Sequence, residues 1–170
     1  MAKSNHKLLR PFIVDVEASG FGSKSYPIEI GVAMEKDNRY CSLILPSHRW
    51  THWDKAAEKT HCITREILVR HGKRLEDVAK ELNRLLEGLT VYTDGWVVDK
   101  PWITRLFSEA GIRQAFSVSP LERILTEPQM EIWHNTKEKV ISSMDLTRHR
   151  ASADAYIVQE TFYRTRIKTC

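Results

Sequence analysis

Cysteines, long apolar runs and low-complexity tracts are scarce in this chain of 170 residues, and each scarcity excludes a class of protein. The cysteines, Cys41, Cys62 and Cys170, are odd in number and widely spaced, so they match neither a disulfide framework nor a zinc site. No apolar run approaches the roughly 20 residues that span a bilayer, and residues 1–10 lack the apolar core of a secretory signal. We therefore expect a cytoplasmic protein with free thiols and no membrane partner.

Length, composition and charge are those of one folded domain with a polyanionic partner. The chain is long enough to bury a core, and 42% hydrophobic with 28% charged residues is ordinary for a globular protein. No repeat or linker divides it, so we predict a single domain over residues 1–170. The net charge is +4. This excess becomes informative beside an acidic site, because the positive charge then lies elsewhere, where a phosphate backbone would run.

Hydrophobic periodicity predicts an α/β layer fold. The predicted strands are residues 11–17, 28–34, 40–45, 90–93 and 116–118. The predicted helices are residues 53–61, 64–71, 75–88, 99–110, 136–148 and 151–166, whereas residues 121–135 fit no single pattern. Only a short turn separates the second and third strands, which predicts an antiparallel hairpin.

Two carboxylates lie inside the first predicted strand. Asp15 and Glu17 interrupt an otherwise apolar, β-branched run, and side chains two apart on a strand point to the same face. Unpaired charges in such a place are costly. A divalent cation is the expected compensation.

Asp99 and Asp154 each lie on the apolar stripe of a predicted helix rather than on its polar side. Acids are favoured at helix starts, so either residue alone has an ordinary structural explanation. Asp99 and Asp154, taken together with the strand pair of Asp15 and Glu17, favour one shared site. His149 immediately precedes the second of these helices and adds an acid–base group.

These residues resemble the DEDDh 3′→5′ exonucleases, the group that contains polymerase proofreading subunits, oligoribonuclease and the tRNA-trimming ribonuclease. Residues 15–21 (DVEASGF) resemble the motif D-x-E-T-T-G-L, and residues 99–103 (DKPWI) resemble the second motif. Residues 149–155 (HRASADA) match H-R-A-x-x-D-A, which is the most specific part. Residues 27–33 and 61–64 resemble the family's I-I-E-I-G-A-V and H-G-I-T segments.

The resemblance implies a ribonuclease H-like fold, a five-stranded mixed sheet flanked by helices on both faces. It implies that Asp15, Glu17, Asp99 and Asp154 hold two Mg²⁺ or Mn²⁺ ions about 3.5–4 Å apart, with His149 as the general base. The partner would be the 3′ end of single-stranded RNA or DNA, and the product a 5′-nucleoside monophosphate. Several relatives are homodimers, so the resemblance also implies a dimer.

The same resemblance places the substrate end. Phe21 takes the wedge position that packs on the last base, His61 lies near the terminal nucleotide, and the backbone amides of Ala18, Ser19 and Gly20 hold the 3′-hydroxyl end. Trp96 is a further aromatic candidate.

Some alternatives stay open. Asp94 is a rival for the third carboxylate, although Asp99 is favoured because only it continues the apolar helical face. On the same fold, the chain could be a non-catalytic nucleic-acid-binding module or a proofreading subunit that needs a polymerase. A third alternative is an unrelated metal-binding domain with accidental motifs.

Overall fold

A five-stranded mixed sheet forms the centre of the protein, in a computed structural model that describes residues 10–170 apart from the side chain of Lys36. The spatial order is β3-β2-β1-β4-β5. The strands are β1 (Ile13–Ala18), β2 (Pro27–Ala33), β3 (Arg39–Leu43), β4 (Thr90–Thr93) and β5 (Ser117–Pro120). The predicted antiparallel hairpin of β2 and β3 is confirmed, and β4 pairs parallel to both β1 and β5.

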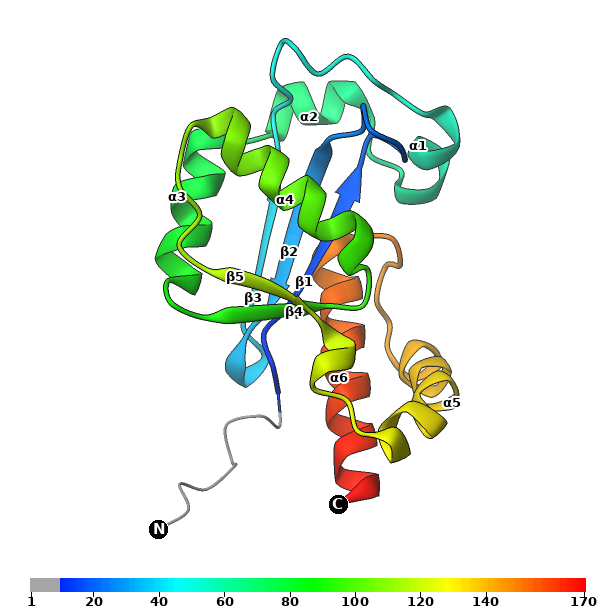
Figure 1. Cartoon of the computed structure of the whole chain (residues 1–170). Coiled ribbons are helices and arrows are strands. Elements are labelled where there is room, and N and C mark those ends of the chain that lie inside the picture. Colours follow the sequence, from blue (N-terminus) through cyan, green and yellow to red (C-terminus); the bar gives the residue numbers. More distant parts are fainter. Residues whose placement is uncertain (1–9) are drawn as a thin grey trace.

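Six α-helices surround this sheet, and two of them pack directly on it (Figure 1). They are α1 (Lys55–His61), α2 (Arg65–His71), α3 (Leu75–Leu86), α4 (Trp96–Ala110), α5 (Glu127–Ser143) and α6 (Ala151–Thr169). Short 3₁₀ turns lie at Glu35–Asp37 and Leu121–Arg123. Helix α6 packs on β1, β2 and β3, and α5 packs on α6. Helix α4 contacts β1 and β5 and pairs with α3, so the sheet carries helices on both faces.

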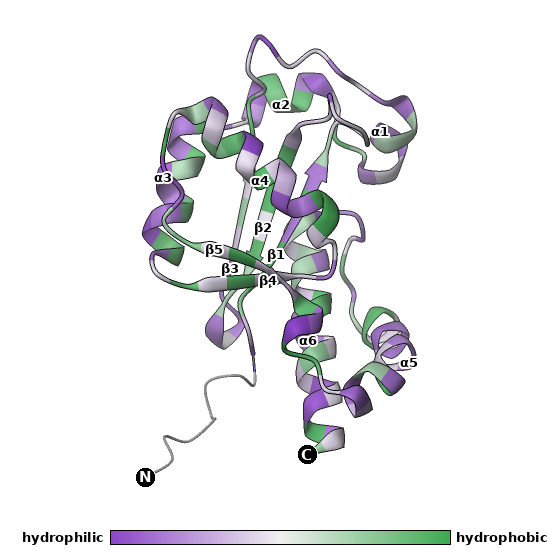
Figure 2. Ribbon diagram, in the orientation of Figure 1, coloured by the Kyte–Doolittle hydropathy of each residue, from purple (hydrophilic) through white to green (hydrophobic). Residues whose placement is uncertain are grey.

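The core is divided by the sheet into two clusters. The larger joins Val14, Val16 and the central residues of β2 to α3 and α4. The smaller joins Ile13 to Ala155, Val158 and Phe162 of α6, among others. Figure 2 shows the strand centres as hydrophobic between helices of mixed hydropathy. Because strand residues alternate between faces, β1 serves both clusters and points Asp15 and Glu17 to the side on which Ile13 lies.

A close approach between β2 and α6 fixes where the last helix begins. A side-chain carbon added to Gly31 would lie 2.1 Å from the backbone nitrogen of Ser152 and 2.3 Å from the carbonyl carbon of Ala151. Only glycine leaves room for this contact. Gly31 is also the register partner of Asp15 on β1, so the first turn of α6 is seated directly beside that carboxylate.

All six predicted helices are found with shifted bounds, and two of them begin three or more residues earlier than predicted. The helix predicted at 99–110 begins at Trp96, because the Thr93 hydroxyl accepts the amide of Gly95 at 2.8 Å and turns the chain earlier. The helix predicted at 136–148 is α5, which begins nine residues earlier, at Glu127. A capping box of Thr126 and Gln129 starts it, so most of the stretch without a clear pattern is helical. The chain then leaves the helix after Ser143.

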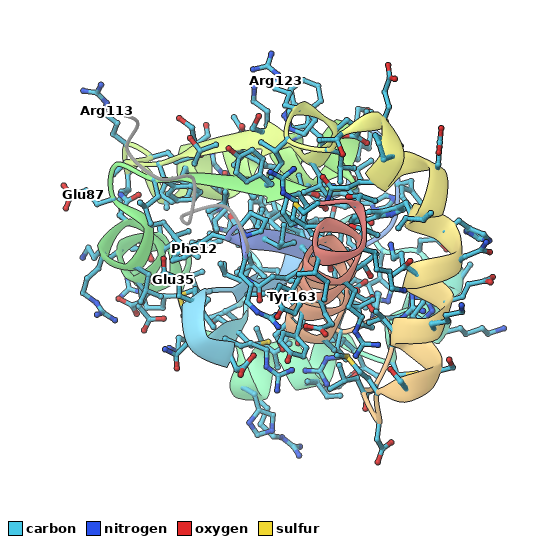
Figure 3. All side chains as sticks on the ribbon, turned by 90° about the horizontal axis from the view of Figure 1, so that it is seen from below. Phe12, Glu35, Glu87, Arg113, Arg123 and Tyr163 are labelled. Atoms are coloured by element: carbon cyan, nitrogen blue, oxygen red, sulfur yellow. The ribbon has the colours of Figure 1, made fainter. Side chains whose placement is uncertain are left out.

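The end of the molecule seen in Figure 3 carries charges of both signs. Glu87, Arg113 and Arg123 project from it, and it is the end away from α1 and α2. Over residues 10–170, the structure has no helix long and apolar enough to cross a membrane. Residues 1–9, on which the expectation about a secretory signal falls, lie outside the described residues.

Candidate functional site

A cleft of about 390 Å³ opens at the carboxyl end of β1, between the first turns of α4 and α6. Its lining brings together all five residues predicted to be catalytic, from positions 15 to 154 of the sequence. These are Asp15, Glu17, Asp99, His149 and Asp154. Ala18, Gly20, Phe21 and His61 line the same cleft, as does Trp102.

Asp15 and Glu17 form the strand side of the cleft. One carboxylate oxygen from each, together with one from Asp154, lie within 4.8 Å of one another. Burial raises the pKa of Asp15 well above its ordinary value, and the neighbouring Asp99, Glu17 and Asp154 raise it further. Burial, followed by the charge of Asp154, raises the pKa of Glu17 to about 7. The strand therefore supplies oxygen donors whose negative charge lacks compensation from the protein.

Asp99 forms the helix side of the cleft and is buried, at 3% exposed. Its carboxylate accepts a hydrogen bond from the Thr93 hydroxyl at the end of β4. Burial raises the pKa of Asp99 to about 7, although the Thr93 hydrogen bond acts in the opposite direction. Thr93 thus holds the Asp99 carboxylate next to Asp15 and also sets the start of α4.

Asp154 and His149 form the loop side, where the chain enters α6. The Asp154 carboxylate accepts the Arg148 Nε–H at 2.8 Å and the backbone amide of His149 at 3.0 Å. His149 has a φ of 59°, a left-handed conformation that is uncommon outside glycine. The two hydrogen bonds to Asp154 hold this short loop, and His149 lines the cleft.

A buried ion pair anchors the loop side to the sheet. Glu29, which is fully buried on β2, accepts two hydrogen bonds from the Arg150 Nε–H, at 3.0 and 3.1 Å, and one from its NH2 group at 2.5 Å. It also accepts the amide of Ala151 at 2.8 Å. The Glu29 pair and the Gly31 contact therefore hold the residues between His149 and Asp154 against β2.

The loop after β1 presents Phe21 to the solvent at the mouth of the cleft. Phe21 is 73% exposed, and its ring centroid lies 6.1 Å from that of Trp102. Ser19 does not face the cleft. Its amide donates to the Tyr26 carbonyl, and its buried hydroxyl accepts the amide of Tyr26 and lies 3.0 Å from His52 Nδ1. Ser19 thus shapes the loop rather than offering donors to a ligand.

His61 offers a hydrogen-bond donor to the cleft. Its Nδ1 accepts the amide of Ile63 at 3.0 Å, so a neutral ring carries its proton on Nε2. Burial lowers the pKa of His61, which favours that neutral form. Nε2 is buried and makes no hydrogen bond to any of the residues that the structure describes. An unpartnered buried donor beside a cleft suits an oxygen of a ligand.

Asp94, the rival for the third carboxylate, lies outside the cleft. It is exposed and pairs with Lys137 at 2.6 Å. It does not line the cleft, whereas Asp99 does. The structure therefore favours Asp99 as the helix carboxylate.

Four supporting residues were missed from the sequence: Thr93, Arg148, Glu29 and Arg150. A signal for Glu29 was present, because it is a carboxylate inside the apolar stretch of residues 27–33. Its partner lies 121 positions further along the chain, and no local pattern indicates such a pairing.

Comparisons with known proteins identify the fold. No family model and no curated protein matches the sequence. Among solved structures, the zinc-ion-bound complex of E. coli exonuclease I with single-stranded DNA matches with a TM-score of 0.71 and 12% identity, over 92% of this chain and 40% of that chain. Exonuclease I of Methylocaldum szegediense matches with a TM-score of 0.65 and 12% identity, over 91% and 40%. The fold is therefore ribonuclease H-like, as predicted, and the chain spans about two fifths of these proteins.

The acidic cleft fits a divalent cation. Three carboxylate oxygens converge from β1 and α6, and burial together with the neighbouring carboxylates raises the pKa values of Asp15 and Glu17. Carboxylate oxygens without cysteine or a cluster of histidines suit a hard divalent cation.

Proposed function

We propose that this protein is a metal-dependent 3′→5′ exonuclease of the DEDDh type, which hydrolyses phosphodiester bonds at the 3′ end of single-stranded nucleic acid. The observation that carries the proposal is the convergence of Asp15, Glu17 and Asp154 within 4.8 Å, in a cleft also lined by Asp99 and His149. The fold shared with exonuclease I, which has been crystallised with single-stranded DNA, supports it.

Asp15, Glu17, Asp99 and Asp154 are the ligands in this proposal, and Mg²⁺ or Mn²⁺ is the ion. These four carboxylates would hold a pair of such ions, which would supply positive charge for the scissile phosphate and a lowered pKa for the attacking water. Asp15 has the central place, because the charges of Asp99, Glu17 and Asp154 all act on it.

His149 is the general base of the proposed reaction. It takes the proton from the attacking water, because it lines the cleft together with Asp154 and an imidazole nitrogen can accept a proton. Its left-handed backbone and the hydrogen bond from its amide to Asp154 tie the position of the ring to that of a metal ligand. The water oxygen bonds to phosphorus and the bond between phosphorus and the 3′ oxygen of the preceding nucleotide breaks. That 3′ oxygen takes up a proton from solvent, and a 5′-nucleoside monophosphate leaves.

The terminal nucleotide is held by residues at the cleft mouth. Phe21 packs on the last base, since an exposed ring above the cleft serves any base by stacking. The His61 Nε2–H donates to an oxygen of the terminal nucleotide. The backbone at Ala18 and Gly20 borders the 3′-hydroxyl end.

Residues 1–170 act as one exonuclease domain in this proposal, and the homodimer implied by the resemblance stays a prediction that the oligomeric state in solution will test. RNA and DNA are both substrates to be compared.

Degradation of 5′-labelled single-stranded RNA and DNA tests the function, with Mg²⁺, Mn²⁺ or EDTA. We expect a ladder that shortens from the 3′ end, requires metal and disappears with Asp154→Ala. Asp145→Ala is the matched control, because Asp145 is exposed in the loop before α6 and does not line the cleft. A ladder that persists with Asp154→Ala or in EDTA contradicts the proposal. Binding without cleavage in either metal would indicate a non-catalytic module instead.

A further inference from the structure

A second hollow lies on the outer face of α4, separate from the acidic cleft. This groove has a volume of about 830 Å³, and no carboxylate of the acidic cleft lines it. Its walls combine aromatic with basic side chains: Trp50, Trp96, Arg49, Lys100 and Arg105. Nothing in the proposed reaction uses these five residues.

Helix α4 is the wall between the two hollows. Its residues Gly95, Val98, Asp99 and Trp102 line the cleft, whereas Trp96 and the residues at positions 97, 100, 101, 104, 105 and 108 line the groove. The groove therefore begins at the same end of α4 as the carboxylate of Asp99. It runs along the helix away from the cleft.

The loop that carries Phe21 is hydrogen-bonded to Arg105, a wall residue of the groove. Arg105 donates to the Ser23 carbonyl at 2.9 Å and to the Ser25 carbonyl at 2.7 Å. The Trp102 indole donates to the Ser25 hydroxyl at 2.8 Å. These contacts join the groove wall to the loop whose phenylalanine lies at the mouth of the cleft.

The charge of the groove suits a phosphate chain. Of its three cations, Arg49 is paired with Glu109 at 2.9 Å. Lys100 makes no ion pair with a carboxylate anywhere in residues 10–170, and its Nζ lies 4.9 Å from the centroid of the Trp96 ring. Lys100 and Trp96 are both exposed. A free ammonium beside an exposed indole offers one contact to a phosphate and one stacking surface to a base.

The length of the groove corresponds to a few nucleotides. Residues 96 to 108 span about 18 Å at the helical rise of about 1.5 Å per residue. A stacked single strand advances about 3.4 Å per nucleotide, so the groove can accompany about five nucleotides.

We propose that the α4 groove binds the part of a single-stranded nucleic acid that precedes its 3′ end. In this arrangement, the last nucleotides enter the acidic cleft past Phe21, and the upstream strand lies along α4. Trp96 stacks on a base, and Lys100 contacts a backbone phosphate. This binding site gives the protein a preference for longer strands. The direction of the strand in this inference rests on the proposed function.

Binding and cleavage of a 3-mer and a 10-mer with the same 3′ sequence test the groove. Trp96→Ala and Lys100→Gln are the variants, and Lys80→Gln is the control, because Lys80 is an exposed lysine on the neighbouring helix α3 that lines neither hollow. Fluorescence anisotropy in EDTA gives the Kd of the 10-mer without cleavage. Cleavage in Mg²⁺ gives KM for both lengths.

We expect each groove variant to raise the Kd of the 10-mer about tenfold, the value of one stacking or phosphate contact. The KM of the 10-mer rises in parallel and that of the 3-mer changes much less. Lys100→Gln also lowers the slope of log affinity against log salt by about 0.7. An unchanged Kd of the 10-mer in both variants overturns the groove, and so does an equal loss in Lys80→Gln. If groove-dependent binding occurs without any cleavage, the inference that the groove binds a single strand is supported and the proposed exonuclease function is contradicted.

Discussion

The strand side and the loop side of the acidic cleft are built in opposite ways. Asp15 and Glu17 are fixed by the backbone of β1, and their pKa values are raised because burial and neighbouring carboxylates outweigh any compensating charge. The Asp154 carboxylate instead accepts hydrogen bonds from the Arg148 side chain and from the backbone amide of His149. Its loop is tied to the sheet through Glu29 and Arg150.

This difference separates two requirements of the site. A strand in the centre of a sheet holds its side chains firmly, so the strand side lacks only positive charge, which a metal supplies. The loop between α5 and α6 has no regular hydrogen bonds of its own, so the loop side first needs anchors. Loss of metal should therefore affect Asp15 and Glu17 on the strand side. Loss of an anchor should instead affect the positions of Asp154 and His149 on the loop side.

The strand side predicts that the metal-free protein loses stability as pH rises. The folded protein keeps protons on Glu17 and Asp99 up to about pH 7, whereas an unfolded chain releases them near pH 4. The folded state thus binds more protons, and the free energy of unfolding falls as pH rises through 7. Between about pH 5.5 and pH 8, Glu17 alone lowers it by about 2 kcal/mol. This corresponds to a Tm lower by about 4–8 °C.

Thermal melts in EDTA and in Mg²⁺ measure this effect. We expect Mg²⁺ to raise Tm more at the higher pH, because the ion binds deprotonated carboxylates. His61 acts in the opposite direction, since its lowered pKa favours the folded state at higher pH. Glu17→Gln isolates the carboxylate and should flatten the decline. A decline of the same size in Glu17→Gln would show that Glu17 is not its cause.

The loop side predicts a loss of activity from a substitution that touches no metal ligand. Glu29→Gln leaves the Arg150 charge without its partner and weakens the seat of the first turn of α6. Breaking a fully buried pair costs about 3–5 kcal/mol. The Arg150 side chain is 41% exposed, so we expect about 2 kcal/mol here. Misplacement of Asp154 and His149 should lower kcat about 10–100-fold, as loss of an outer partner of a metal ligand does.

Glu76→Gln is the matched control for that change. Glu76 makes an exposed pair with Arg74 at 3.4 Å, and surface pairs contribute at most about 1 kcal/mol. Urea unfolding and initial rates measure both variants. A Glu29→Gln protein with full kcat would mean that the loop side does not depend on this anchor.

Phe21→Ala probes the cleft mouth, which belongs to neither side. Its exposed ring contributes little to the core, so we expect Tm to change by less than about 2 °C. Loss of one stacking surface should raise KM about tenfold with a smaller change in kcat. Steady-state kinetics on a short oligonucleotide measure this, and isothermal titration with Mn²⁺ should give unchanged metal affinity. A KM equal to that of the unmodified protein would exclude Phe21 as a base contact.

The sequence predicted the side chains of the cleft better than it predicted what holds them. Asp15 and Glu17 were recognisable because charges are rare in an apolar strand, and Asp154 because it lies on an apolar helical face. The same periodicity failed for α5, whose interface with α6 includes the polar residues Gln129 and Thr136 and therefore shows only a weak stripe. The pairing of Glu29 with Arg150 depends on the close approach at Gly31, which is a property of the folded chain.

Asp94→Asn is the smallest expected effect and tests which carboxylate the strand side requires. Asp94 and Asp99 lie five positions apart, but α4 begins at Trp96 between them, and only Asp99 lines the cleft, where it accepts a hydrogen bond from Thr93. Asp94 pairs with Lys137 near the surface, a contact of at most about 1 kcal/mol. We expect Asp94→Asn to change kcat and KM less than about twofold, because Asp94 is exposed and the effect of its charge on Asp99 is largely screened by solvent. Asp99→Asn, by contrast, should abolish cleavage, and a reversal of these two results would move the helix ligand to Asp94.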